Sequence, residues 1–251
     1  MLLSAVLFDL GSTLVYSKDP WLPIYEQADL ALLNILRQAG IKINSASFYK
    51  DFGGFIQSYY EYKPVDNLET TTFTYLRNWL SKHDFPIPPE MVIRNALNAF
   101  YSVTQTNWIL ENDAIYTLES LKSAGYVLGL VSNTSDDSNV RGIIDHWKLS
   151  PFFNTIVTSA SLGIRKPDAR IFKVALNEIQ VQPEAAVMVG DTLAADILGA
   201  NLMGIYSIWV TRRAETPREG ELAIQPEAVV TELRQIPDLL EEVRNERIKE
   251  N

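Results

Sequence analysis

The sequence predicts an α/β fold in which a parallel sheet is interrupted by an inserted, all-helical unit. An apolar run at residues 2–8 has the character of a strand that is buried on both faces. Residues 17–109 then show only helical periodicity, whereas residues 110–251 alternate helical segments with apolar strand segments. That alternation is typical of a parallel sheet with crossover helices. Because the first strand has to join this later sheet, the helical unit is predicted to be an insertion.

Four helices are expected in the inserted unit. In the first, at residues 21–39, apolar residues recur at helical spacing, and Gly40 follows as a stop signal. The other three are expected at residues 45–60, 68–83 and 89–104, with no strand among them. Aromatic side chains are frequent here, and their helical spacing predicts that most of them are core residues while a few line a pocket.

Strands and helices alternate in the remainder of the chain. Strands are expected at residues 126–131, 155–158, 185–189, 205–210 and 228–230. Helices are expected at residues 137–146, 169–179 and 193–203, with a charged terminal helix at 236–247. The sequence therefore predicts a core domain formed by residues 1–16 and 110–251, with the helical domain at residues 17–109 inserted into it.

Composition excludes several classes of function. The 251 residues include no cysteine, which rules out disulfides, thiolate ligands and a cysteine nucleophile and agrees with a cytoplasmic location. The net charge of −9 opposes binding to nucleic acid, which needs clustered Lys and Arg. No apolar run approaches the roughly 20 residues that cross a bilayer. We therefore expect no nucleic acid partner and no membrane span.

Four short polar segments end predicted strands or follow them closely. They are Asp9-Leu10-Gly11-Ser12, Ser132-Asn133-Thr134, Arg165-Lys166-Pro167 and Gly190-Asp191-Thr192 with Asp196. Because the carboxyl ends of neighbouring parallel strands converge on one crevice, we expect these segments to meet. Together they supply a nucleophilic carboxylate, a hydroxyl donor, an ammonium group and a second pair of carboxylates. That set suits phosphoryl transfer assisted by a hard cation.

Each segment alone has a simpler interpretation. Asp9 could cap a turn, Lys166 could be a solvated loop lysine, and the two aspartates of the last segment could decorate one exposed helix. Arg165 is expected to be solvated. The occurrence of all four segments in order, each with the required chemical type, favours a shared site.

The four segments resemble the sequence motifs of the haloacid-dehalogenase-like hydrolase superfamily, over essentially the whole chain. The resemblance implies a Rossmann-like three-layer core and a helical cap that closes over the active site and selects the substrate. By this similarity Asp9 and Lys166 would be the catalytic residues: Asp9 would attack phosphorus and form an aspartyl-phosphate, and Lys166 would pair with nucleophile and phosphate. Ser132 and Asn133 would bind the phosphate.

The same resemblance implies a magnesium site. Asp9, Asp191 and the backbone carbonyl of Gly11 would bind Mg²⁺, and Asp196 would support the metal directly or through water. The expected activity is magnesium-dependent hydrolysis of a small phosphorylated metabolite, carried out in the cytoplasm by a monomer or homodimer.

Gly11 departs from the phosphatase pattern. In that branch the position two residues after the nucleophile is a second Asp, which protonates the leaving oxygen and then activates water. Such acid–base catalysis is worth ~10²–10⁴-fold, so its absence opposes efficient hydrolysis of unactivated alkyl phosphates. Three interpretations stay open: a phosphatase with a good leaving group or a substitute acid from the cap, a different reaction, or a non-catalytic, regulatory protein.

Dehalogenation is the rival reaction, because a halide leaves without a proton. The fourth segment opposes it, since Gly190-Asp191 with Asp196 resembles the magnesium-binding version of this motif. A phosphatase is therefore the first expectation.

Overall fold

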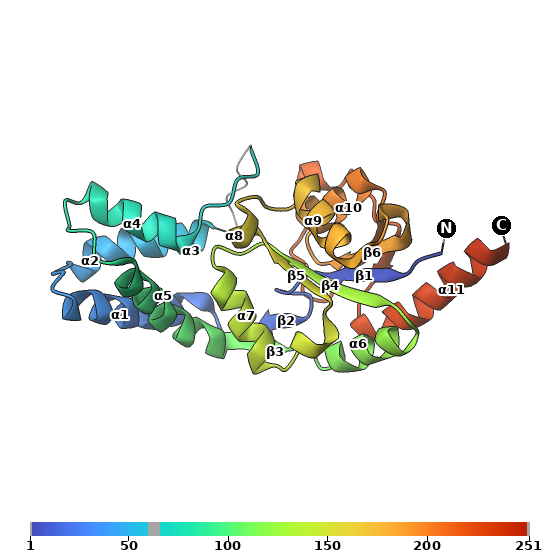
Figure 1. The fold of residues 1–251 in the computed structure, drawn as a ribbon, viewed down its shortest axis with the longest axis horizontal. Coiled ribbons are helices and arrows are strands. Elements are labelled where there is room, and N and C mark those ends of the chain that lie inside the picture. The colour runs from blue at the N-terminus through green and yellow to red at the C-terminus, as the bar shows by residue number, and fades with distance from the viewer. Residues whose placement is uncertain (1, 60–65, 250–251) are drawn as a thin grey trace.

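The centre of the molecule is a sheet of six parallel strands. The computed structural model describes residues 2–59 and 66–249 (Figure 1). The strand order is β5-β4-β1-β6-β7-β8. The strands are β1 (Ala5–Phe8), β4 (Val127–Ser132), β5 (Thr155–Thr158), β6 (Ala186–Gly190), β7 (Tyr206–Val210) and β8 (Ala228–Val230). Strand β1 lies between β4 and β6, so the N-terminal strand does join the later sheet.

Helices cover both faces of this sheet. On one face, Val6 and Phe8 of β1 join an apolar cluster with α6 (Ala114–Ser123), α7 (Asp137–His146) and α11 (Ile236–Lys249). On the other, Leu7 packs with α9 (Ala169–Ile179) and α10 (Leu198–Met203). Alternate residues of β1 thus face opposite layers, as the two-residue period of a strand requires. The predicted Rossmann-like three-layer α/β fold is confirmed.

A second set of helices lies to one side of the sheet in Figure 1. They are α1 (Trp21–Gln38), the continuous run α2 (Ser45–Phe48), η1 (Tyr49–Gly53) and α3 (Gly54–Ser58), then α4 (Thr72–Lys82) and α5 (Glu90–Thr104), followed by the turn η2 (Gln105–Asn107). These helices have an apolar cluster of their own, in which Leu32, Phe52 and Phe100 are fully buried. The domain boundaries expected at residues 17 and 109 stay a prediction.

The two segments that connect the sheet to these helices pair with each other. Strands β2 (Val15–Ser17) and β3 (Trp108–Leu110) form an antiparallel ladder in which Ser17 lies opposite Trp108. This ladder was not expected, because strands of three residues are too short to show a period of two. It brings Trp108 next to the loop that follows β1.

Two expected helices differ from the structure. The helix expected from residue 68 begins at Thr72, because the Thr71 side chain accepts a hydrogen bond from the N–H of Thr74. Leu68 instead forms an isolated bridge with Ile164. The helix expected at residues 193–203 begins with a wide turn, η5 (Leu193–Ile197). Tyr60, the expected end of the second helix, lies outside the described residues.

The remaining short elements connect these layers. They are α8 (Ser159–Leu162), η3 (Ser150–Phe152), η4 (Pro183–Ala185), η6 (Glu219–Glu221) and η7 (Leu233–Gln235). Within the described part of the chain, no helix combines the length and the apolar character needed to cross a membrane.

Candidate active site

Polar residues gather where β1, β4 and β6 end. Asp9 follows β1 directly, Ser132 is the last residue of β4, and Asp191 follows β6. These three strands are adjacent and parallel, so their carboxyl ends share one edge of the sheet. The chain continues from β5, beside β4, to β6 on the far side of β1, and a reversal of this kind creates a ligand crevice. The structure therefore brings the predicted segments together.

Lys166 is the centre of the site. Its Nζ donates hydrogen bonds to Asp9 Oδ1 at 2.6 Å, to Asp196 Oδ1 at 2.6 Å and to the carbonyl of Val131 at 2.7 Å. An ammonium group has three donors, and all three are used. The side chain is 1% exposed. Lys166 is thus not a solvated loop lysine.

Three carboxylates cluster at this site, and two of them, Asp9 and Asp196, bind the ammonium group. Asp9, Asp191 and Asp196 each offer an oxygen, and these oxygens lie within 4.8 Å of one another. Burial raises the pKa of Asp9 to about 6; Lys166 opposes this shift and Asp196 adds to it. Burial, with the charges of Asp196 and Asp9, raises the pKa of Asp191 well above its ordinary value. Burial alone would lower the pKa of Lys166, but its two carboxylate partners raise it, so the ammonium stays charged.

The loop after β6 is held in place by its own backbone and by a neighbouring strand. The N–H of Thr192 donates to Asp196 Oδ2 at 2.9 Å, and the indole of Trp209 donates to the carbonyl of Asp191 at 2.7 Å. A Cβ on Gly190 would lie 2.3 Å from the Asp196 carboxyl group, so only glycine fits there. The two oxygens of Asp196 accept hydrogen bonds, Oδ1 from Lys166 and Oδ2 from Thr192. This arrangement suits a supporting position beside a metal ion.

Asn133 connects the second and third segments. Its Oδ1 accepts from the N–H of Lys166 at 2.8 Å, and its Nδ2 donates to the carbonyl of Lys166 at 3.1 Å. The amide group therefore fixes the backbone that carries the central lysine. This geometry supports a positioning role for the Asn133 side chain, and its contact with phosphate stays a prediction. Ser132, at the end of β4, is buried.

Arg165 lies in a different environment from the expected one. Its side chain is only 12% exposed, and its guanidinium group stacks on the ring of Tyr59 at 4.7 Å. Its Nε lies 4.0 Å from the buried carboxylate of Glu69, and the backbone N–H of Arg165 donates to the carbonyl of Asn67. The expectation of a solvated Arg165 is wrong, because residues 67–69 from the helical part pack against this loop.

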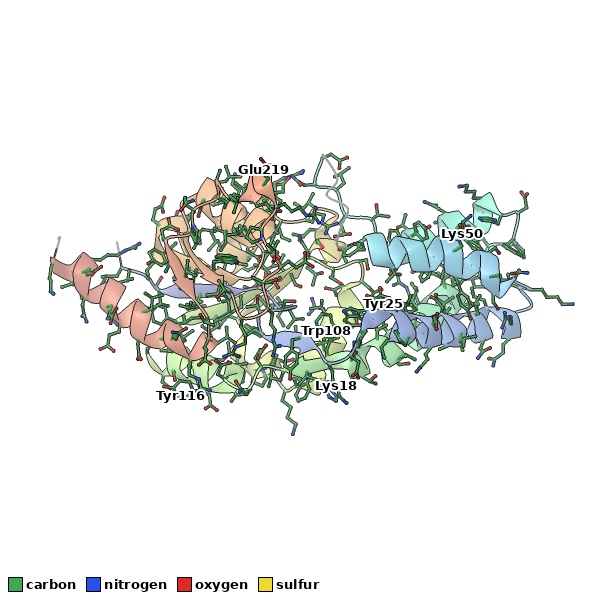
Figure 2. All side chains as sticks on the ribbon, turned by 180° about the vertical axis from the view of Figure 1, so that it is seen from behind. Lys18, Tyr25, Lys50, Trp108, Tyr116 and Glu219 are labelled. Atoms are coloured by element: carbon green, nitrogen blue, oxygen red, sulfur yellow. The ribbon has the colours of Figure 1, made fainter. Side chains whose placement is uncertain are left out.

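Gly11 contacts an aromatic ring that sequence reasoning missed. A Cβ at Gly11 would lie 3.4 Å from Cη2 and 3.8 Å from Cζ3 of Trp108. In Figure 2, Trp108 lies between the sheet and the second set of helices. The two residues are 97 positions apart, and only the pairing of β2 with β3 brings them together. The indole therefore borders the space where a second catalytic carboxylate would stand.

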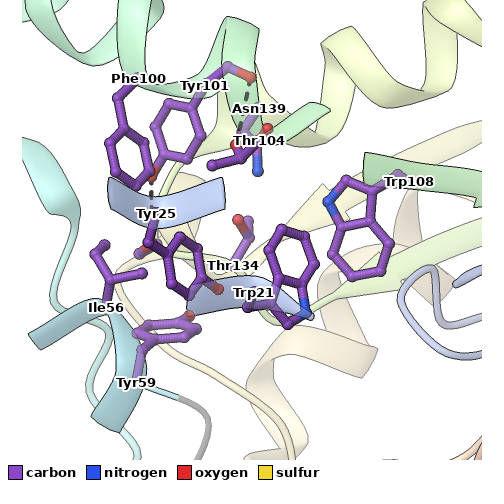
Figure 3. A pocket seen from close by; sticks show the side chains of 11 residues that line it. Trp21, Tyr25, Ile56, Tyr59, Phe100, Tyr101, Thr104, Trp108, Thr134 and Asn139 are labelled. Atoms are coloured by element: carbon purple, nitrogen blue, oxygen red, sulfur yellow. Dashed lines mark hydrogen bonds between the residues drawn. The ribbon is translucent and has the colours of Figure 1, made fainter. Parts of the chain in front are cut away.

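A cavity lies between the helices and the end of β4 (Figure 3). It is lined by Trp21, Tyr25, Ile56, Tyr59, Phe100, Tyr101, Thr104, Trp108, Thr134, Ser135 and Asn139. The indoles of Trp21 and Trp108 lie side by side in the figure, with ring centroids 5.1 Å apart. Trp21 also stacks on Tyr25 at 5.2 Å. Among the described residues of the helical part, the aromatic side chains are mostly core, as predicted, and a few line this cavity.

Comparison with known proteins agrees with the motifs. The family model described as haloacid dehalogenase-like hydrolase matches residues 6–210. A glyceraldehyde 3-phosphate phosphatase of Pyrococcus furiosus is 28% identical over 95% of this chain and 93% of its own length. The relative is therefore of the phosphatase type and matches over nearly its full length.

Two solved structures share the fold. A haloacid-dehalogenase-type phosphatase from Thermococcus onnurineus has a TM-score of 0.64 at 22% identity, covering 95% of this chain and 98% of its own. A 2-haloacid dehalogenase from Pseudomonas syringae has a TM-score of 0.68 at 23% identity, covering 96% and 99%. Since one is a phosphatase and the other a dehalogenase, likeness at this level shows the fold alone. The family model matches most of the chain, and the strand ends of the fold bring the four motifs together. This chain therefore belongs to the haloacid dehalogenase-like hydrolases.

Proposed function

We propose that this protein is a magnesium-dependent phosphatase of a small phosphorylated metabolite, with Asp9 as its nucleophile. The observation that carries the proposal is the buried contact of Lys166 with Asp9 and Asp196, beside a third carboxylate on Asp191. The similarity to a glyceraldehyde 3-phosphate phosphatase supports a small phosphorylated substrate. Residues 17–109 would act as a cap over this site. A cytoplasmic location and a monomeric or homodimeric state are part of the proposal.

The residues present fit a divalent cation. Burial raises the pKa values of Asp9 and Asp191, and the charge of Asp196 adds to both shifts. The three clustered carboxylates leave an excess of negative charge beside one ammonium group. A hard cation with oxygen ligands would relieve this excess. Asp9, Asp191 and the carbonyl of Gly11 would hold Mg²⁺, with Asp196 in support. When bound, the ion would offset negative charge on the substrate phosphate.

The chain's own residues account for the reaction steps. A carboxylate oxygen of Asp9 attacks phosphorus, and the bond to the leaving oxygen breaks with its electron pair. Lys166 orients Asp9 and offsets charge on the transferring group, while the hydroxyl of Ser132 donates to a phosphoryl oxygen. Water then attacks phosphorus, which restores Asp9 and releases phosphate. The proton of this water passes to solvent, because Gly11 offers no base.

Turnover tests the proposal directly. Phosphate release from aryl, acyl and sugar phosphates should require magnesium and should disappear in Asp9→Asn. Asp238→Asn, an exposed position on α11, is the matched control and should behave as the wild type. A protein that binds magnesium by calorimetry but hydrolyses none of these esters would contradict the proposal and favour a non-catalytic role. Release of halide from a 2-haloacid without metal would favour dehalogenation.

A further inference from the structure

A short segment of the helical part, residues 67–69, runs antiparallel to residues 163–165 of the core. Two backbone hydrogen bonds of 2.9 Å join the two segments, from the N–H of Glu69 to the carbonyl of Gly163 and from the N–H of Arg165 to the carbonyl of Asn67. Residues 163–165 lead directly into Lys166, the central residue of the candidate site. The helical part is therefore paired with the loop that carries this lysine.

The side chain of Glu69 connects this pairing with the loop that follows Ser132. Its Oε2 accepts hydrogen bonds from the hydroxyl group of Ser159 at 2.6 Å and from that of Tyr59 at 2.7 Å. The Oγ of Ser159 in turn accepts from the N–H of Thr134 at 2.8 Å and lies 3.0 Å from the carbonyl of the same residue. Thr134 follows Ser132 by two residues. Two successive hydrogen bonds therefore join Glu69 to the backbone of the second motif segment.

The carboxyl group of Glu69 is buried at a cost to the fold. The side chain is 0% exposed, and Oε1 has no hydrogen-bond partner among the described residues. The Nε of Arg165 lies 4.0 Å from Oε2, which is too far for a hydrogen bond. Burial raises the pKa of Glu69, although the hydrogen bonds from Ser159 and Tyr59 oppose this shift. An apolar side chain would avoid this cost, so the carboxyl group points to a role for the hydrogen bonds that it accepts.

The two loops that Glu69 contacts are those of the proposed phosphate site. Asn133 already joins them, because its side chain binds both the N–H and the carbonyl of Lys166. Glu69 adds a second connection, in which its backbone holds the loop before Lys166 and its side chain holds Thr134 through one hydroxyl group. A shift of these loops would move the Ser132 hydroxyl relative to a bound phosphate, and small misplacements of such groups are costly.

Resting on the proposed function, we propose that Glu69 is a positioning residue for phosphate binding, which fixes, through Ser159, the loop from which Ser132 binds a phosphoryl oxygen. The helical part then contributes to the phosphate site itself and not only to the selection of the leaving group. In this role Glu69 acts through the hydroxyl group of Ser159 and the backbone of Thr134. Its effect is therefore the same for inorganic phosphate and for every phosphate ester.

Binding of inorganic phosphate in the presence of magnesium tests this role without turnover. By calorimetry, the Kd should be roughly tenfold higher in Glu69→Ala than in the wild type, because the loop loses a hydrogen-bonded support. Glu69→Gln should recover most of this loss, since its amide oxygen can accept from the same two hydroxyl groups. Glu90→Ala, at an exposed glutamate of α5, is the matched control and should bind phosphate as the wild type does. An unchanged Kd in Glu69→Ala would overturn the proposal.

A double-mutant cycle shows whether Glu69 acts through Ser159. Ser159→Ala alone should also raise the Kd for phosphate roughly tenfold, and Glu69→Ala should add less than about twofold in that background. Separate effects that multiply to roughly a hundredfold would contradict the connection. If Glu69→Ala fails to fold, Ser159→Ala decides the question together with Glu69→Gln, and a Kd that is unchanged in Ser159→Ala overturns the proposal.

Two substrates of different size separate positioning from substrate selection. In Glu69→Ala, kcat/KM for acetyl phosphate and for phenyl phosphate should fall by the same factor, because both esters present the same phosphoryl group to Ser132. A loss confined to phenyl phosphate would assign Glu69 to selection of the leaving group and would overturn the proposal.

Hydrogen exchange distinguishes failure of this inference from failure of the proposed function. Without ligand, the amides of residues 132–135 should exchange roughly tenfold faster in Glu69→Ala than in the wild type, while those of β7 should be unchanged. Turnover and phosphate binding that survive intact in Glu69→Ala would overturn the inference and leave the proposed function standing. Absence of both in the wild type would remove the proposed function, and the exchange rates would still decide whether Glu69 fixes this loop.

Discussion

Two ionic clusters in this molecule, one buried and one partly exposed, differ in their balance of charge. At the ends of β1 and β6, one ammonium group, that of Lys166, faces three carboxylates. Near β3, three guanidinium groups face three carboxylates. The second cluster consists of Arg212, Arg213 and Arg234 with Glu111, Asp113 and Glu232.

The balanced cluster stabilises the connection between the sheet and the helices. Arg212 donates to Glu111 at 2.8 Å and to both oxygens of Asp113 at 2.9 Å. Arg213 binds Glu111 and also lies 4.0 Å above the ring of Tyr16 in β2. Burial alone would raise the pKa of Asp113, but hydrogen bonds from Arg212 and from the backbone of Arg234 bring it below its ordinary value. These carboxylates are satisfied by the protein itself.

The comparison distinguishes charged side chains that stabilise the fold from charged side chains that would bind a ligand. The pKa of Asp113 falls because hydrogen bonds from Arg212 and from the backbone of Arg234 outweigh its burial. At Asp9 and Asp191, burial outweighs the charge of Lys166, so their pKa values rise. The opposite shifts accompany the difference in charge balance, and they identify the cluster that is short of positive charge. That cluster is the one at the ends of the motif-bearing strands.

The largest effect is expected from removal of the single cation. In Lys166→Met, kcat should fall by roughly 10²–10³-fold or more, and the free energy of unfolding should fall by about 3–5 kcal/mol, because Asp9 and Asp196 lose a buried partner. Phosphate release and urea denaturation measure the two effects. Unchanged stability would mean that solvent reaches these carboxylates.

Breaking the balanced cluster should affect stability and leave metal binding unchanged. Arg212→Met should lower the free energy of unfolding by about 2–4 kcal/mol at neutral pH. Because the pKa of Asp113 is lowered in the folded state, this contribution should disappear as pH falls through that lowered value. Arg141→Met, which removes an exposed pair with Asp137, should cost less than about 0.5 kcal/mol. Loss of magnesium affinity in Arg212→Met would show that the two clusters are coupled.

Magnesium itself should distinguish the clusters. At a concentration 100 times its Kd, the ion should stabilise the wild type by about 2.7 kcal/mol. Asp191→Ala should abolish this gain, whereas Arg212→Met should retain it. Thermal denaturation with magnesium and with a chelator measures the difference. An equal gain in Asp191→Ala would place the metal elsewhere.

Asp29 in α1 provides a third case, a buried carboxylate whose Oδ1 has no hydrogen-bond partner in the described structure. Burial raises its pKa from 3.8 to about 7. The unfolded chain releases this proton at lower pH than the folded one, so the free energy of unfolding should fall as pH rises between these values. The free energy of unfolding of Asp29→Asn should exceed that of the wild type by about 1–2 kcal/mol at pH 8. This is only part of the free energy that ionisation of the buried Asp29 costs, because the amide of the variant still lacks one hydrogen-bond partner.

The advantage of Asp29→Asn should be absent near pH 4, where the wild-type carboxyl group is protonated in the folded state. Urea denaturation at the two pH values measures it, and Asp238→Asn is the exposed control. A variant that is stabilised equally at both pH values would exclude the charge as the cause.

The sheet and the polar edge could be predicted because their signals are local. Buried strands are continuous apolar runs, and three of the motifs begin where their strands end, whereas Lys166 lies eight residues after the end of β5. The contacts of Trp108 and Arg165 could not be predicted, since Trp108 depends on a three-residue ladder and Arg165 on the packing of Tyr59 and Glu69. The start of α4 differed for the same kind of reason, because Leu68 pairs with Ile164 instead of continuing a helix.

The ladder of β2 and β3 has a consequence for exchanging parts between related proteins. Trp108 belongs to the ladder, opposite Ser17, and not to the helices beyond it. A helical unit grafted between these two residues would replace Trp21, Tyr25 and Tyr59 but would leave the indole beside Gly11. The ring beside the loop after β1 would then be inherited with the recipient sheet, so such a chimaera would keep one aromatic neighbour of Gly11 from the recipient.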